Sequence, residues 1–311
     1  MKLGVFTTIM SNMPLKEALE YFKSIGIEAI ELGCGGYAGK AHADPEILLN
    51  DEAKFQEFMK TIENSGLTVC SLSCHGNPIH PNKEIAARHR KAFENAVLLA
   101  EKMGVDTINA FSGCAGDSET AKYPNWVTCP WPDDFSNILK WQWEEVLIPY
   151  WKEAVKFAKD HGVNKIAIEM HPGFMVYNTE TLLKLREAVG DEIGANLDPS
   201  HLIWQQMNPK RVIEELGDAI FHFHAKDTKI DRNNTDLNGV IDTKKYREIE
   251  KRSFVFRTVG YGNGEEYWRD IILALKKVGY NGAISIENED ALLSKTEGLE
   301  KAAELLNKLL S

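Results

Sequence analysis

The sequence predicts a single (β/α)₈ barrel, the architecture known as a TIM barrel. First, a helix-like segment that ends in glycine and is followed within a few residues by a short apolar run recurs seven times. Second, the 311 residues, 43 % hydrophobic and 26 % charged, have the composition of an ordinary globular protein and the length of one large barrel. A doubly wound sheet is the alternative, but it usually has fewer strands, and no Gly-x-Gly-x-x-Gly follows the first apolar run.

The predicted strands begin with residues 2–9 and continue with the seven apolar runs that follow glycines. Glycine adopts the left-handed conformation that ends a helix, and the β-rich run after it is typical of a buried parallel strand. These runs are residues 28–32, 68–72, 107–111, 165–169, 193–197, 220–224 and 283–287. Segments with helical period and length lie between them, for instance at residues 14–24, 53–64, 85–102, 143–160 and 268–277, and a last helix is expected near residues 297–310. Eight alternating strand and helix units predict the barrel.

Two connections are long, but no linker rich in proline, glycine or serine divides the chain, which predicts one domain over residues 1–311. The long connections, residues 114–140 and 228–263, follow the fourth and seventh strands, so both lie at the end of the barrel that carries catalytic sites. Three of the seven tryptophans lie between residues 126 and 141. Their aromatic faces suit either the C–H faces of a sugar or the interface of a homo-oligomer.

The charge balance and the cysteines restrict the partners and the compartment. The chain has 36 Lys+Arg against 46 Asp+Glu, a net charge of −10, which argues against nucleic acid and anionic membranes as partners. No apolar stretch approaches the ~18 residues of a membrane helix, and the first residues do not resemble a signal peptide. The five cysteines are odd in number and scattered, so no disulfide framework and a cytoplasmic location are expected.

A metal-ligand residue stands at the end of each predicted strand from the fifth to the eighth. These residues are Glu169, Asp198, His224 and Glu287. Because the carboxyl ends of parallel strands meet at one rim of a barrel, the four side chains are expected to converge there. Three carboxylates at one rim would repel one another without a cation. Three oxygen donors and one imidazole suit Mn²⁺ first, or Mg²⁺, with Co²⁺ and Zn²⁺ as alternatives, so one divalent ion is predicted at this face.

The motifs around these strand ends are the most specific pieces of the sequence. They are Glu169 at its strand end, Asp198-Pro199-Ser200-His201, His224-Ala225-Lys226-Asp227 and Ile286-Glu287-Asn288-Glu289-Asp290. Over essentially the whole chain the sequence resembles the xylose isomerase-like barrel superfamily of sugar isomerases and epimerases, which also contains the endonuclease IV type of DNA-repair enzyme. It is especially similar to bacterial proteins labelled sugar phosphate isomerase/epimerase.

The resemblance implies a divalent-metal-dependent sugar isomerase or epimerase. In that family the residues that match Glu169, Asp198, His224 and Glu287 hold one ion, and the two glutamates double as acid and base. One glutamate would remove the proton α to a ketose carbonyl, giving a metal-stabilised enediolate, and the other would return a proton. The resemblance does not say which glutamate acts first, which sugar reacts, or whether that sugar is phosphorylated.

Five further residues are predicted to contact a carbohydrate substrate. They are His201, His75, His171, Lys226 and Arg257. The family match implies that His201 donates to a substrate oxygen near the metal; its structural alternative is a capping or packing role. His171 would share the facing of Glu169, because side chains along a strand alternate with period two.

For the charged residues near the rim, the sequence allows either a contact with substrate or an ion pair. Lys226 and Arg257 would bind a phosphate or hydroxyls, or balance Asp227 and Glu289. Glu31 ends the second predicted strand, where it would touch substrate or form an ion pair.

Parity also places His222 one layer below His224. It is expected to be a core residue or a support behind the site.

A DNA-repair enzyme of the same superfamily is the least favoured alternative. Those enzymes hold three metals with extra histidines, one of them ending the fourth strand and another in an Asp-x-His after the seventh. Here residues 109–113 read Asn-Ala-Phe-Ser-Gly, and Asp227-Thr228-Lys229 offers no histidine. The net charge of −10 also opposes duplex binding.

A lyase or dehydratase fits the same residues, because an enediolate can expel a β-substituent. The resemblance includes inosose dehydratases and the catalytic subunits of bacterial C-deglycosylation enzymes, which cleave 3-keto-glycosides and work with a small β-rich partner subunit. An isomerase or epimerase is the first expectation and a lyase the second. A non-catalytic sugar-binding protein is the last, since such a protein would tolerate loss of one glutamate and both are present.

Overall fold

The computed structural model describes residues 1–311, and its eight parallel strands form a closed barrel in the order β1-β10-β7-β6-β5-β4-β3-β2. The barrel strands are β1 (Lys2–Phe6), β2 (Ala29–Gly33), β3 (Thr68–Ser73), β4 (Thr107–Phe111), β5 (Lys165–Glu169), β6 (Ile193–Leu197), β7 (Ile220–Ala225) and β10 (Ala283–Ile286). The prediction of a (β/α)₈ barrel is confirmed. Strands β2, β6 and β10 are buried at every residue, as expected of parallel strands covered on both faces.

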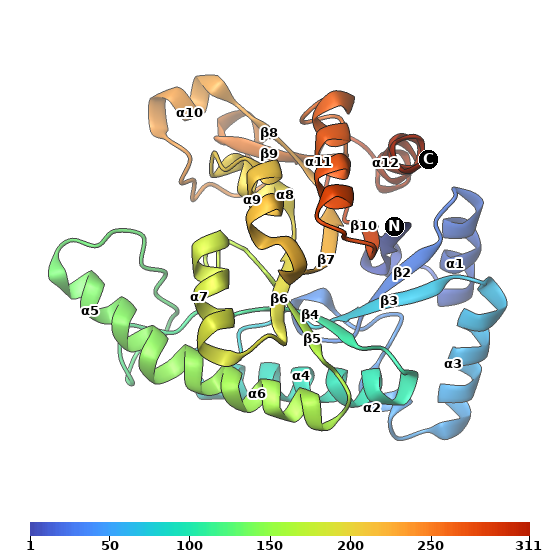
Figure 1. The fold of residues 1–311 in the computed structure, drawn as a ribbon, viewed down its shortest axis with the longest axis horizontal. Helices are drawn as coiled ribbons and strands as arrows, with labels where there is room; N and C mark the ends of the chain where they lie inside the picture. The colour runs from blue at the N-terminus through green and yellow to red at the C-terminus, as the bar shows by residue number, and fades with distance from the viewer. The chain divides into compact units, whose positions relative to one another are not determined.

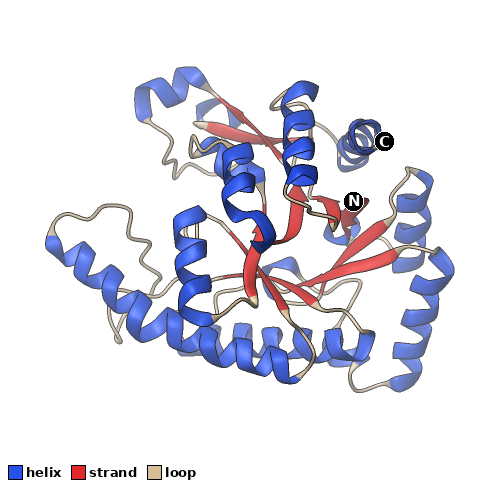
Figure 2. Ribbon diagram, viewed as in Figure 1, coloured by secondary structure: helices blue, strands red, loops and turns tan.

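Helices alternate with the barrel strands along the chain (Figure 2). The α-helices are α1 (Leu15–Ser24), α2 (Pro45–Leu48), α3 (Glu52–Ser65), α4 (Lys83–Met103), α5 (Asp133–Trp141), α6 (Ile148–Asp160), α7 (Thr179–Val189), α8 (Pro199–Trp204), α9 (Pro209–Leu216), α10 (Arg232–Asn238), α11 (Glu265–Lys277) and α12 (Lys295–Leu310). Short turns of other helix types are η1 (Thr7–Met10), η2 (Gly36–Ala38), η3 (Gln142–Leu147), η4 (Gly217–Ala219) and η5 (Ile249–Lys251).

The glycine stops that predicted the repeat are present in the structure. Gly104 ends α4 in the left-handed conformation, with φ 71° and ψ 31°, and its N–H donates to the carbonyls of Ala100 and Glu101. A side chain in this conformation would be strained, so glycine is favoured there. All seven predicted stops have positive φ: Gly26, Gly66, Gly104, Gly162, Gly190, Gly217 and Gly279.

The chain divides into two compact units. The first comprises Met1–Glu31, Ile62–Cys70 and Leu197–Ser311. In it, β1 pairs with β10 and with the start of β2, and β10 pairs with β7. The second comprises Leu32–Thr61 and Ser71–Asn196, where β4 pairs with β3 and β5, and β5 with β6. The expectation of a single domain over residues 1–311 stays a prediction.

The long connection predicted at residues 228–263 contains a small antiparallel sheet of β8 (Asp227–Ile230) and β9 (Phe254–Arg257), drawn in orange in Figure 1 beside α10. The sheet packs on α8, where Trp204 stacks on Phe254 with ring centroids 4.7 Å apart. No tight hairpin turn marked this pair in the sequence, since 23 residues separate the two strands.

Asp227, the first residue of β8, holds the loop that follows β9. Its Oδ2 accepts the backbone N–H groups of Gly260, Gly262 and Asn263, at 2.9–3.1 Å, and the indole N–H of Trp268 at 3.0 Å. One alternative from the sequence was that Asp227 forms an ion pair with Lys226 or Arg257. Instead this buried carboxylate binds N–H donors, so that alternative is wrong.

The other long connection is shorter than predicted, because the helix expected at residues 143–160 already begins at Asp133. Helix α5 continues through the π-helical turn η3 into α6. Pro132 precedes it and two acidic residues occupy its first turn, both of which favour a helix start.

None of the helices combines the length and apolar character needed to cross a membrane. All five cysteines are free thiols.

Candidate metal centre

Three of the four predicted metal ligands lie together in the first unit. Asp198 follows β6 directly, His224 lies in β7 and Glu287 follows β10. One ligand atom of each lies within 4.8 Å of the others, and His224 Nδ1 is 3.0 Å from Glu287 Oε2. Two carboxylates and an imidazole at this spacing fit a divalent cation. The cluster is therefore a candidate metal centre.

Local structure fixes Asp198 at this point. The residue after it, Pro199, is the first of α8, where a proline without an N–H is tolerated. Asp198 Oδ1 accepts the N–H of Ser200 at 2.8 Å, so the carboxylate caps the helix. Its other oxygen, Oδ2, lies 3.3 Å from His201 Nε2. The predicted contact of His201 with substrate stays a prediction.

Lys226 supplies a buried positive charge beside these carboxylates. Its Nζ lies 2.6 Å from Glu289, 3.3 Å from Glu287 and 3.7 Å from Asp198. The ring of Phe256 covers the ammonium group at 4.5 Å. The predicted pairing with Glu289 is confirmed, and a substrate contact of Lys226 stays a prediction.

Arg257 ends β9 and pairs with an aspartate that the sequence did not assign to it. Its Nε is 3.1 Å from both carboxylate oxygens of Asp290. Asp290 also accepts the N–H of Thr258 at 2.8 Å. The alternative that Arg257 forms an ion pair with Asp227 or Glu289 is therefore wrong, because its partner is Asp290. Its predicted role at the substrate is untouched by this and remains a prediction.

Glu169 and His75 lie together in the second unit. Glu169 is the last residue of β5, and its Oε2 is 2.9 Å from His75 Nε2 and accepts Asn196 Nδ2 at 3.2 Å. Phe111 packs against the ring of His75 with centroids 4.6 Å apart. The glutamate is buried, so its carboxylate is held by polar partners rather than by water.

His171 lies in the turn after β5, not within the strand as the period-two argument assumed. The strand ends at Glu169, and His171 Nδ1 lies 2.6 Å from the carbonyl oxygen of Pro172. Its ring packs edge-on against Phe111 and Phe174. Parity with Glu169 therefore does not apply, because alternation holds only while the backbone is extended.

Glu31 forms the ion pair that was one of its two predicted roles, but its partners were not predicted. His222 Nε2 and His224 Nε2 both lie 2.9 Å from Glu31 Oε2, and Ser285 Oγ donates to the same oxygen at 2.7 Å. His222 is buried, as expected. The signal in the sequence was weak: it consisted of single polar residues on β2, β7 and β10, and β2 pairs with neither of the other two strands.

Charge shapes the protonation of this group. Burial would raise the pKa of Glu31, but His224 and His222 beside it hold that pKa well below its usual range. Burial would lower the pKa of His224, but the carboxylates of Glu31 and Glu287 raise it well above its usual value.

A cavity of about 340 Å³ opens beside Glu287 within the same unit. Its lining is mostly polar and consists of Phe6, Thr8, Ile9, Glu287, Asn288, Glu289, Asp290 and Lys295. The volume lies at the small end of ligand pockets. A small polar molecule in it would lie next to the Glu287 carboxylate.

A family model described as "Xylose isomerase-like TIM barrel" matches residues 19–309. The chain belongs to this family. It is 37 % identical over 313 residues to the uncharacterized protein YfiH of Bacillus subtilis (strain 168), and the match covers 100 % of both chains.

Solved structures share the fold at low sequence identity. A D-tagatose 3-epimerase-like protein superposes with a TM-score of 0.65 at 21 % identity, covering 100 % of this chain and 98 % of the other. The IolI protein with a bound zinc atom gives 0.66 at 20 %, with the same coverage. The probable 3-DHS dehydratase AsbF of Bacillus anthracis gives 0.68 at 15 %, covering 99 % of both chains. These likenesses establish the architecture of the chain.

Proposed function

We propose that this protein is a divalent-metal-dependent sugar isomerase or epimerase that removes a proton α to a carbonyl group. One observation carries the proposal: the donor cluster of Asp198, His224 and Glu287 lies beside a polar cavity large enough for a small molecule. Similarity to a D-tagatose 3-epimerase-like protein and to a zinc-binding relative in fold supports it.

Glu169 would complete the metal site as its fourth ligand. It ends β5, and β5, β6, β7 and β10 are consecutive in the order of the barrel strands. Ligands that stand at the carboxyl ends of four neighbouring strands can share one ion. A bound divalent ion would polarise a substrate carbonyl and stabilise the negative charge that develops on its oxygen. Mn²⁺ is the ion that we expect first, with Mg²⁺, Co²⁺ or Zn²⁺ as alternatives.

Glu287 is suited to move the proton. Its side chain keeps 18 % of its surface exposed, whereas His224 and Asp198 keep none. A carboxylate that both lines the cavity and touches the ligand cluster can reach a substrate carbon and accept its proton. Glu169 would return a proton to the other face of that carbon, or to the neighbouring carbon.

The substrate would be a small carbohydrate, with His201, His75, His171, Lys226 and Arg257 as its proposed contacts. We place the reaction in the cytoplasm, in keeping with five free cysteines. We further propose that the chain forms a homo-oligomer or, if it is a lyase, works with a small β-rich partner subunit.

A lyase that eliminates a β-substituent is the second candidate, and the likeness in fold to a dehydratase favours keeping it. Ketoses, inososes and 3-keto-glycosides incubated with Mn²⁺ in D₂O and followed by NMR would separate the two. Deuterium at one carbon would identify isomerase or epimerase chemistry, and a released leaving group would identify the lyase. A sugar that binds but shows neither change would indicate a non-catalytic sugar-binding protein.

Replacing Glu287 with Gln tests the acid–base role. The amide cannot take a proton, so exchange of the substrate α-proton with solvent should fall at least about 100-fold. Circular dichroism and the melting temperature should show an intact barrel. Glu297→Gln, on the exposed face of α12, is the matched control and should leave exchange unchanged. Undiminished exchange in Glu287→Gln would remove Glu287 from the reaction.

A further inference from the structure

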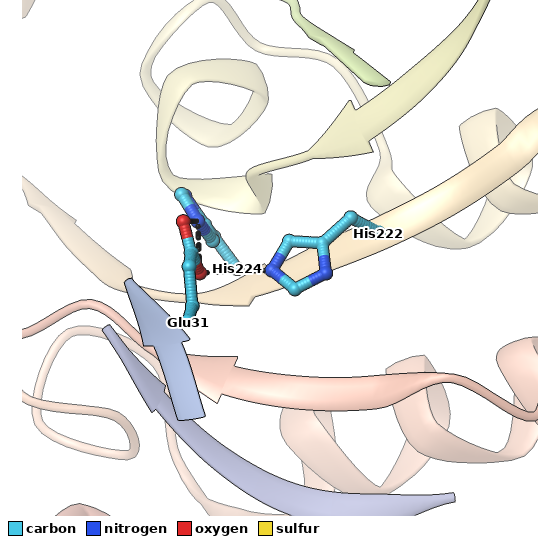
Figure 3. Close-up of side chains that lie close together, drawn as sticks. All are labelled: Glu31, His222 and His224. Carbon is cyan, nitrogen blue, oxygen red and sulfur yellow. Dashed lines mark hydrogen bonds and ion pairs between the residues drawn. The ribbon is translucent and has the colours of Figure 1, made fainter. Parts of the chain in front are cut away.

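Glu31, His222 and His224 meet inside the first unit (Figure 3). His224 also belongs to the candidate metal centre, but no step of the proposed reaction uses Glu31 or His222. The glutamate comes from β2 and both histidines come from β7. All three side chains are buried: His222 keeps 2 % of its side-chain surface exposed, and His224 and Glu31 keep none. Such a group must be satisfied internally, since water does not reach it.

We infer that Glu31 is a positioning residue that fixes which nitrogen His224 offers to a metal, an inference that rests on the proposed function. His224 Nε2 lies 3.0 and 2.9 Å from the two oxygens of Glu31. An ionised carboxylate only accepts hydrogen bonds, so Nε2 carries a proton and donates. The remaining nitrogen, Nδ1, faces Glu287 at 3.0 Å. It is therefore Nδ1 that His224 presents to the ligand cluster.

The ring of His224 is also held from the side. Phe6 stacks on it with centroids 5.7 Å apart and an angle of 23° between the planes. Stacking fixes the plane of the ring, and the Glu31 contact fixes its rotation within that plane. Metal-binding histidines commonly donate their second N–H to a carboxylate in this way, which sets the tautomer and raises the basicity of the bound nitrogen.

His222 and Ser285 keep Glu31 in place. His222 Nε2 and Ser285 Oγ both donate to Glu31 Oε2, at 2.9 and 2.7 Å. Without these donors a buried carboxylate would be costly, and it would turn toward any other donor within reach. The pair thus supports the glutamate, and the glutamate supports the ligand His224.

A second cation held by Glu31, His222 and His224 is the competing interpretation, since one ligand atom of each lies within 4.8 Å of the others. Against it, Ser285 Oγ and both Nε2 groups already lie at hydrogen-bond distance from the carboxylate. The two interpretations differ in stoichiometry. Positioning requires one ion per chain, whereas a second site requires two.

The test is the affinity for Zn²⁺ and Mn²⁺ of the metal-stripped chain and its Glu31→Gln variant, measured by competition with a chelator dye. Gln keeps the shape of Glu but weakens the acceptor for His224, so metal affinity should fall about 10- to 100-fold at an unchanged one ion per chain. Glu28→Gln, at the other end of β2 where Glu28 accepts the Leu3 N–H, is the control and should bind like wild type. Equal affinity in Glu31→Gln, or two ions per chain, would overturn the inference.

A measurement on the wild-type chain guards against a variant that does not fold. In ¹⁵N-histidine-labelled protein loaded with Zn²⁺, NMR should show His224 with a proton on Nε2 and the metal on Nδ1. The opposite assignment would overturn the inference. If the wild-type chain binds no metal, both this inference and the proposed function fail. If it binds metal but exchanges no substrate proton, only the proposed function fails.

Discussion

Asp227 shows how a buried charge in this protein can serve architecture rather than chemistry. Its Oδ2 accepts hydrogen bonds from three backbone N–H groups of the loop after β9 and from the indole N–H of Trp268 in α11. Its other oxygen accepts Thr228 N–H and Asn263 Nδ2, both at 2.8 Å. Burial raises the pKa of Asp227, and the surrounding N–H donors oppose that rise.

Replacing Asp227 with Asn should destabilise the fold without changing its shape. The amide group turns one acceptor oxygen into a donor, so at least two N–H groups would lose their partner, at a total cost of about 3 kcal/mol. Urea unfolding measures this loss. Asp270→Asn, an exposed carboxylate on α11, should change the free energy of unfolding by no more than about 0.5 kcal/mol. A similar small change in Asp227→Asn would contradict the anchoring role.

At the same scale, the sequence predicted the residue types of the site better than their partners. The candidate ligands Asp198, His224 and Glu287 could be named because each stands at or near a strand end, and strand ends can be predicted from local patterns. Glu31 could not be tied to His224, because β2 and β7 are not paired and the two side chains meet only in the folded barrel. Side-chain contacts such as Arg257 with Asp290 depend on β9, which local patterns did not reveal.

The segment from β8 to β9 has its own anchor at Asp242. This carboxylate accepts the N–H of Lys244 at 2.9 Å and that of Ser253 at 2.7 Å. Burial would raise its pKa, but those N–H groups and the Lys244 ammonium lower it from its ordinary 3.8 to about 2. Asp242 thereby ties the middle of the segment to Ser253, the residue just before β9.

This lowered pKa predicts a pH dependence of stability. A carboxyl group with a depressed folded pKa stabilises the fold above its unfolded pKa of about 4, and that contribution is lost as the pH falls from about 4 to 2. The free-energy difference between wild type and Asp242→Asn should therefore shrink by about 2 kcal/mol over that range. Denaturant unfolding at a series of pH values measures it. A difference that is independent of pH would exclude the effect, and Asp236→Asn on α10 is the exposed control.

At the scale of elements, the regular alternation of helix, glycine and apolar run predicted the strands and helices of the barrel. The repeat predicted the seven glycine stops and the seven barrel strands that follow them, within a few residues, and the opening run at residues 2–9 predicted β1. The β8–β9 pair was missed because no short turn motif connects the two strands, which are 23 residues apart. The start of α5 was missed because Pro132, Asp133 and Asp134 lie among prolines and aromatic residues that are typical of a loop.

For the molecule as a whole, a resident divalent ion should raise the melting temperature. A ligand that binds only the folded state stabilises it by about 2.7 kcal/mol at 100 times its dissociation constant, which is several degrees for a chain of this size. Scanning calorimetry after EDTA treatment and after addition of Mn²⁺ measures this shift. Asp198→Ala should lose most of it. Identical melting temperatures with and without metal would mean that no such ion binds.

The pairing of β1 with β10 has a consequence for how the chain folds during its synthesis. Lys2 lies opposite Ala283, and Glu31 receives its hydrogen bonds from His222 and Ser285, 191 and 254 residues later. During synthesis, β1 leaves the ribosome first, but it cannot pair with both of its neighbours, β2 and β10, until β10 has been made. A nascent chain cut short before residue 285 lacks the hydroxyl that holds Glu31. Contacts this distant in sequence form slowly. We therefore expect the metal ligands to be assembled only after release of a nearly finished chain, so that truncated products carry no working centre.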